Sequence, residues 1–165
     1  MPSDLRPVLV CCAVLLAGCT SAEDEGRFSR ESAQDLAQKF QQALAKGDVP
    51  ALVRLSRTPF RYKDAKRVWP DAATLQTNLA KEVPRIRHLV AVHDRVEAYS
   101  RRDLMDGKWP RDRRVPDDRR ESEVAALGIE ENGWLVRVYS EGRPGYLLVL
   151  NPEGLDRLAV QMIEI

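Results

Sequence analysis

The chain has 165 residues, and its 26 lysines and arginines nearly balance 25 aspartates and glutamates, leaving a formal net charge of +1. A near-neutral chain offers no basic footprint, so we expect no nucleic-acid partner. With only three cysteines and two histidines, it also lacks the ligands of a cysteine- or histidine-rich centre, and we expect neither a metal nor another cofactor.

The first 19 residues have the pattern of an exported lipoprotein. Arg6 precedes an apolar run over residues 8–16, which is shorter than the roughly 20 residues that span a bilayer as a helix. The run ends in Leu-Ala-Gly-Cys at residues 16–19, which resembles the lipobox of bacterial lipoproteins. The resemblance implies that Cys19 receives a diacylglyceryl group, that the Gly18–Cys19 bond is cleaved, and that the new amino terminus is acylated. The alternative is an ordinary cleaved signal with a chance cysteine.

This resemblance also implies an address. Residues 1–18 become a signal peptide and residues 19–28 a lipidated tether, which is polar and acidic from Thr20 to Gly26. Several acyl chains on Cys19 hold a protein on the membrane durably, since burial contributes about 0.8 kcal/mol per CH₂. In the lipoprotein family an aspartate after the cysteine favours the inner membrane. Thr20 in that place implies the outer membrane, facing the periplasm.

Residues 29–165 are predicted to form one α+β domain that begins with helices. Ser29 or Ser32 can cap the first helix, and Gly47 can end it. Its apolar stripe, spaced by three and four, consists of Ala33, Leu36, Ala37, Phe40, Ala43 and Leu44. Asp48 can cap a short second helix that closes before Thr58-Pro59.

A third helix is expected over residues 72–83, capped by Asp71 and ended or kinked by Pro84. Between the second and third helices, residues 60–62 form a short strand candidate. From residue 89 the apolar period changes to two, which predicts a half-buried strand. Residues 101–121 alternate opposite charges, which favours a solvated loop or a long hairpin end.

Four more strands are predicted in the last part of the chain, at residues 123–130, 134–140, 145–151 and 158–165. Asn132-Gly133 is a strong hairpin signal between the first two. Helices followed by an antiparallel meander indicate the α+β class, with the helices covering the apolar face of the sheet.

The order of these elements is similar to the nuclear transport factor 2-like superfamily. The likeness lies in the junction Gly47-Asp48 between two helices, the third helix at residues 72–83 and the terminal meander. It implies a cone, in which a long helix and two shorter ones pack into a strongly bent sheet. Members include dehydratases, isomerases, polyketide-cyclase-like enzymes and non-catalytic binding modules, so the fold alone selects no function.

Three residues are candidates for a site. Asp94 lies in the apolar phase of its strand, beside Val92 and Val96, and a buried carboxylate must be paired, protonated in a pocket or turned outward by a bulge. A pocket would make it the catalytic acid or base. Trp109, in the charged insertion, is a candidate contact for a partner, or a plug that folds back on the core. Trp134 is a candidate for ligand stacking or for packing.

Three functions remain open from the sequence. The first is a lipid-anchored cell-envelope module that binds a small ligand or a protein partner without catalysis. The second is an isomerase- or dehydratase-like enzyme with Asp94 as general base. The third is a structural subunit of an envelope complex with an exposed apolar patch. No paired acid, base and nucleophile is visible in the sequence, and this favours the first function.

Overall fold

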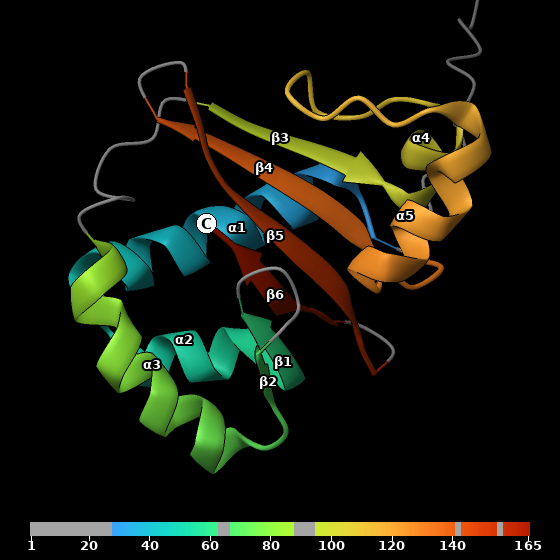
Figure 1. Ribbon diagram of the computed structural model, residues 1–165. Helices are drawn as coiled ribbons and strands as arrows, with labels where there is room; N and C mark the ends of the chain where they lie inside the picture. The colour runs from blue at the N-terminus through green and yellow to red at the C-terminus, as the bar shows by residue number, and fades with distance from the viewer. Residues whose placement is uncertain (1–27, 63–66, 88–94, 141–142, 155–156) are drawn as a thin grey trace, which may run out of the picture.

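The computed structural model describes residues 28–62, 67–87, 95–140, 143–154 and 157–165 (Figure 1). Within these ranges, six strands form one sheet in the order β2-β1-β6-β5-β4-β3. The strands are β1 (Ser56–Tyr62), β2 (Arg67–Trp69), β3 (Arg95–Ser100), β4 (Trp134–Ser140), β5 (Arg143–Glu153) and β6 (Arg157–Glu164). Neighbours are antiparallel, except that β1 and β6 run parallel.

The first three helices form where the sequence predicts them, because their ends are set locally. Helix α1 (Arg30–Lys46) is capped by Ser29, whose side chain accepts from the Ser32 backbone N–H, and ends at Gly47 with φ 72°. Helix α2 (Val49–Leu55) is capped by Asp48 and α3 (Ala72–Ile86) by Asp71. Pro84 does not end α3, because it lies inside the helix, which continues to Ile86.

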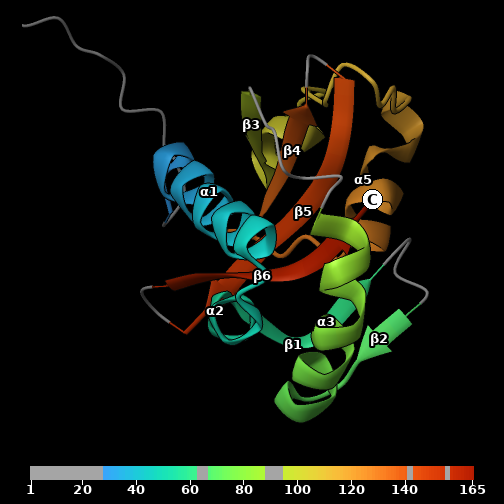
Figure 2. The ribbon, with the colours of Figure 1, turned by 90° about the vertical axis from the view of Figure 1, so that its left-hand side faces the viewer.

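These three helices cover one face of the sheet, as Figure 2 shows in front of β5 and β6. Phe40, on the inner side of α1, is only 1% exposed and packs into a core built from the helices and the facing strands. On the sheet this core includes Trp134, Val136, Val138, Tyr146, Leu148 and Leu150. The structure thus confirms the α+β class, with helices packed on a curved and largely antiparallel sheet.

The other face of the sheet is covered too, and here two predictions were wrong. Residues 101–121 are not simply a loop or hairpin end, because they contain α4 (Arg101–Met105) and η2 (Asp117–Arg119), a single 3-10 turn. The strand expected over residues 123–130 is instead helix α5 (Arg120–Leu127). Figure 1 shows α4 and α5 across the strands from α3.

A second core explains why this segment is helical. Leu104, Val124 and Leu127 are buried against apolar side chains from the sheet. The sheet contributes Leu135, Leu147, Val149 and Met162, which alternate with the residues of the first core. Because β4 and β5 are apolar on both faces, each face needs a covering layer, and a charged loop could not bury the second one.

The Asn132-Gly133 hairpin signal was also misread, since these residues join α5 to β4 rather than two strands. The fully buried Asn151 fixes this junction: its Nδ2 donates to the Gly128 carbonyl at 2.7 Å, and its Oδ1 accepts from the Glu130 N–H at 2.9 Å. A Cβ on Gly133 would lie 2.3 Å from the Asn151 Oδ1. Glycine is therefore required here by close approach and not by turn type.

Several predictions fall outside the described residues. They are the signal peptide, Cys19 and the tether as far as residue 27, together with Asp94 and the start of its strand. Phe28, where the tether ends, packs into the first core. Among the described helices, none has the length and apolar character needed to cross a membrane.

Candidate functional site: a groove between α1, α2 and β6

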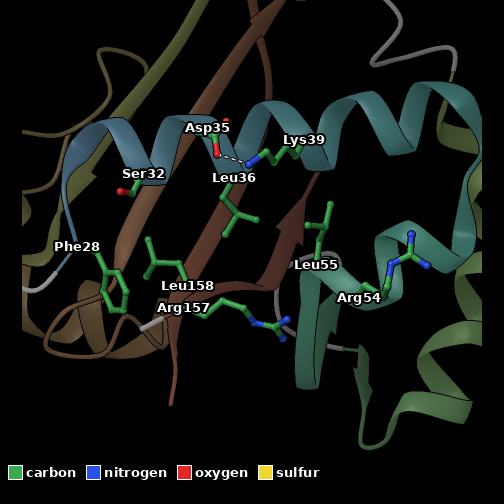
Figure 3. A pocket seen from close by; sticks show the side chains of 9 residues that line it. All are labelled: Phe28, Ser32, Asp35, Leu36, Lys39, Arg54, Leu55, Arg157 and Leu158. Atoms are coloured by element: carbon green, nitrogen blue, oxygen red, sulfur yellow. Dashed lines mark hydrogen bonds and ion pairs between the residues drawn. The ribbon is translucent and has the colours of Figure 1, made fainter. Parts of the chain in front are cut away.

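A groove of about 370 Å³ opens on the surface where three elements meet. It is lined by Phe28, Ser32, Asp35, Leu36, Lys39, Arg54, Leu55, Arg157 and Leu158 (Figure 3). They come from α1 with the residue just before its cap, from the last turn of α2 and from the first two residues of β6. Its volume lies at the lower end of the range for small-molecule sites, about 300–1,000 Å³.

The helical period places four α1 side chains on the groove. Ser32, Asp35, Leu36 and Lys39 are spaced by three and four residues, so they lie on one face of the helix. That face lies beside the buried Phe40 row, and the helix therefore packs on the sheet with one side and borders the groove with the next. This part of α1 spans roughly 10 Å at a rise of 1.5 Å per residue.

The floor of the groove is apolar. Phe28, Leu36 and Leu158 are 8%, 8% and 7% exposed, and Leu55 is partly buried. All four also belong to or pack against the first core, so the floor is held by the same contacts that stabilise the domain. An apolar group that enters the groove therefore meets a preformed surface and needs no rearrangement of the core.

The rim of the groove carries charge, and most of it is paired. Lys39 Nζ donates to Asp35 Oδ2 at 2.6 Å, and Arg157 forms an ion pair with Glu153. Within the part of the chain that the structure describes, Arg54 has no ion-pair partner. Three cations and one carboxylate line the groove, so the rim attracts an anion.

This arrangement favours binding over chemistry. Asp35 is the groove's single carboxylate among the described residues, and it forms an ion pair with Lys39. No group of three or more possible metal ligands occurs in the described ranges. An apolar floor under a cationic rim can hold a small molecule with an apolar body and an acidic end.

Trp109 and Trp134, two of the three residues singled out from the sequence, do not line this groove. Asp94 lies outside the described residues. Trp134 is buried in the first core, 3% exposed. Trp109 packs against the second core, where its Nε1 donates to the Leu104 carbonyl at 2.8 Å and the Arg113 guanidinium lies 6.0 Å from its ring centre. This placement of Trp109 agrees with the plug alternative, and roles for these residues in binding stay predictions.

One polar atom in the first core stands out. The Tyr146 hydroxyl is buried, and among the described residues it has no hydrogen-bond partner. Desolvation by burial raises the pKa of this phenol above its ordinary value, so it is neutral at every physiological pH. It can donate one hydrogen bond within the first core.

An ionic cluster around Glu97 lies away from the groove and serves the fold. Glu97 on β3 accepts from the hydroxyls of Tyr99 at 2.7 Å and Tyr139 at 2.9 Å, and Arg95 lies 3.2 Å away. Burial raises the Glu97 pKa, but these donors and Arg95 outweigh it and hold the pKa below its usual value. The cluster joins the edge strand β3 to β4.

Comparison with known proteins assigns no family to this chain. No protein-family profile matches the sequence, and no curated protein matches it. The chain is similar to a solved structure described as "Rd1NTF2_04 with long sheet", at 14% identity over 81% of this chain and 98% of the other, with a TM-score of 0.36. It is also similar to a substituted form of Rd1NTF2_05, at 9% identity over 81% and 96% of the two chains, with a TM-score of 0.37. The fold class of this chain rests on its own helices and strand order.

No groove residue was predicted as a site from the sequence. The groove combines residues 130 positions apart, from Phe28 to Leu158, and none of the three short segments carries a motif. The available signal was the first helix itself, where Ser32, Asp35 and Lys39 stand beside an apolar stripe. Such a boundary between polar and apolar faces is common to every amphipathic helix, so it identifies no site.

Proposed function

We propose that this chain is a lipid-anchored module of the cell envelope that binds a small ligand in the groove between α1, α2 and β6 and performs no catalysis of its own. The observation that carries the proposal is the preformed apolar floor under a cationic rim. Described residues provide no acid–base pair at this place, so the groove is suited to holding a molecule rather than converting it.

The expected anchor lies close in sequence to the first residue of the groove. Cys19 precedes Phe28, a groove residue, by nine positions, and nine extended residues reach about 30 Å at most. A lipidated Cys19 therefore keeps the groove within that distance of the membrane surface. A module held there would meet ligands that leave or enter the membrane, which suits an apolar binding floor.

The anchor is tested by the variant Cys19→Ser in the native host. Wild-type protein should partition into the detergent phase and lose its first 18 residues, whereas the variant should stay unlipidated. Equal partitioning of both proteins into detergent would refute the lipid anchor. This experiment is independent of what the groove binds.

The groove is tested with the fluorescent probe anilinonaphthalene sulfonate, which has an apolar ring system and an anionic group. A chain starting at Thr20 is used, since both hydrophobic cores lie within residues 28–165. The probe should bind saturably, and Ser32→Trp should abolish binding, because the indole fills the space above Leu36. Gln38→Trp, an exposed site on the same helix outside the groove, is the matched control and should bind normally.

Equal probe binding by Ser32→Trp and wild type, with both chains folded by circular dichroism, would show that the groove is not the binding site. Loss of binding in both tryptophan variants would also contradict the proposal, since the control lies outside the groove.

A further inference from the structure

We propose that the ligand of this groove is a single-chain amphiphile with one carboxylate, that Arg54 binds the carboxylate, and that the alkyl chain lies along the floor toward Phe28. This inference rests on the proposed function, because it names the ligand class of the same groove. It specifies the charge of the ligand, the direction in which the alkyl chain lies and the residue that binds the carboxylate.

Ion pairing on the rim of the groove sets the charge that a ligand must carry. Of the three cations that line the groove, Lys39 is neutralised by Asp35 and Arg157 by Glu153. Arg54 is left without an ion pair among the described residues, so one negative charge balances the groove. A head group with two or more charges would have to compete with Asp35 or Glu153 for their cations.

The order of the side chains along the groove sets the direction in which a ligand lies. Figure 3 shows Phe28 and Arg54 at opposite ends of the groove, with Leu36, Leu55 and Leu158 between them. The polar end and the apolar end of the site are thus separated along its length. A ligand with one charged end and one apolar chain matches this order, whereas a compact anion would leave the floor exposed to water.

The guanidinium of Arg54 has the donor geometry that suits a carboxylate. A guanidinium presents paired N–H donors in a plane, which match the two oxygens of a carboxylate in a bidentate contact. Arg54 lies in the last turn of α2 and is exposed, so its guanidinium can turn toward a ligand. Lys39 and Arg157 flank the same space but stay paired with Asp35 and Glu153, so the recognition of the carboxylate falls to Arg54.

The chain's own tether is the main competing occupant. Glu23, Asp24 and Glu25 lie three to five residues before Phe28 and are within reach of the rim if extended. They bring three charges to one unpaired arginine and no apolar side chain to the floor. The amphiphile satisfies both the charge and the floor, and we therefore favour it over the tether.

The inference is tested by isothermal titration of the Thr20–Ile165 chain with three ten-carbon probes below their micelle concentrations. These are decanoate, the cationic decyltrimethylammonium and the uncharged decyl maltoside. Decanoate should bind at least tenfold more tightly than the other two. Arg54→Gln should weaken decanoate about tenfold, which is ~1.4 kcal/mol, and leave decyl maltoside unchanged.

Two further variants sharpen the test. Arg54→Lys keeps the charge but loses the planar fork, so its affinity for decanoate should fall between those of wild type and Arg54→Gln. Arg102→Gln removes an exposed arginine from α4, on the opposite face of the sheet, and should bind decanoate as wild type does. This control separates a site effect from a change in overall charge.

Each remaining outcome overturns the inference. Equal decanoate affinity in Arg54→Gln and wild type, while Ser32→Trp still abolishes binding, refutes the role of Arg54 and leaves the proposed function standing. Binding of decanoate that survives Ser32→Trp refutes both. If decanoate binds only after residues 20–26 are deleted, the acidic tether is the occupant and the carboxylate ligand is refuted.

Discussion

Replacing Asp103 tests how the insertion between β3 and β4 is fastened to the rest of the domain. Its carboxylate is 10% exposed and accepts hydrogen bonds from both the N–H and the hydroxyl of Ser100, at 3.1 and 3.0 Å. Arg30, at the start of α1, and Lys108, after α4, each lie 3.0 Å away. One side chain thus joins α4 to β3 and to the first helix.

The magnitude follows from these contacts. Asp103→Ala breaks the half of the α4 capping box in which the Asp103 carboxylate accepts from the Ser100 N–H, while the Ser100 hydroxyl can still cap the backbone N–H of residue 103. The Ser100 N–H is then left without its acceptor, which costs about 1–3 kcal/mol if water cannot replace it. Arg30 and Lys108 are 49% and 62% exposed, so their ion pairs add only about 0–1 kcal/mol. A loss of about 2–3 kcal/mol in the free energy of unfolding is expected.

The same group predicts a pH dependence. Burial raises the pKa of Asp103, but hydrogen bonds from Lys108 and Ser100 and the charge of Arg30 outweigh it and hold the pKa below its ordinary value. A lowered pKa means that the stabilisation is complete above the unfolded-state pKa of about 3.9 and is lost as the pH falls through the folded-state value. Asp103→Asn should therefore lose stability less steeply than wild type below about pH 4.

Urea unfolding followed by circular dichroism, at pH 7 and pH 3, measures both effects. Asp106→Asn is the matched control, since Asp106 is an exposed acid three residues along the chain, and it should change stability by less than about 0.5 kcal/mol. If Asp103→Ala costs less than about 0.5 kcal/mol at pH 7, the carboxylate does not fasten the insertion, and this account of its contacts is wrong.

Three other substitutions test the packing. Phe40→Ala should cost about 3–5 kcal/mol in chemical unfolding, because Phe40 is 1% exposed in the first core; a loss below about 0.5 kcal/mol would show an exposed face. Tyr146→Phe should leave stability equal or raise it by up to about 1 kcal/mol in thermal unfolding, since the hydroxyl it removes lacks a partner; a loss above that size contradicts the reading. Gly133→Ala should cost about 1–3 kcal/mol, because its Cβ would lie 2.3 Å from Asn151 Oδ1 and 3.0 Å from the Glu130 backbone, and unchanged stability would mean that the junction can shift.

The parts of the fold that the sequence predicted well are those set by local chemistry. Ser29, Asp48 and Asp71 cap their helices through their own side chains, and Gly47 ends α1 in the left-handed region. Such signals act over a few residues and can be read without knowing the tertiary structure. The strands β4, β5 and β6 were also found near their predicted ranges, since apolar runs between turns mark them.

Helix α5 was missed because a tertiary requirement outweighed a local signal. Asn132-Gly133 suggested a hairpin and therefore a strand before it, although Val124 and Leu127, three apart, followed by Gly128 at φ 72°, fit the end of a helix. The neglected evidence lay in β4 and β5, whose nearly continuous apolar runs mean that both faces of the sheet are buried. A second covering layer then had to come from residues 101–127.

The groove could not be predicted for a different reason. It exists only after α1, the end of α2 and the start of β6 are brought together by the sheet, which pairs β6 with β1 across about 100 residues. Arg54 differs from Lys39 and Arg157 because those two rim cations have ion-pair partners among the described residues. Such pairing depends on the positions of side chains in the folded chain, which sequence patterns do not give. The candidates that the sequence did offer, Asp94, Trp109 and Trp134, were chosen from strand phase and residue type alone.

The most direct test of the central proposal is to locate the bound ligand by nuclear magnetic resonance. Decanoate is titrated into the ¹⁵N-labelled Thr20–Ile165 chain, and the backbone amide shifts are followed. We expect the largest changes at three places: residues 28–39, which lead into and begin α1; Arg54 and Leu55; and Arg157 and Leu158. Shifts concentrated instead on the inner face, around Tyr146 and α3, would place the ligand in the first core and contradict the groove as the binding site.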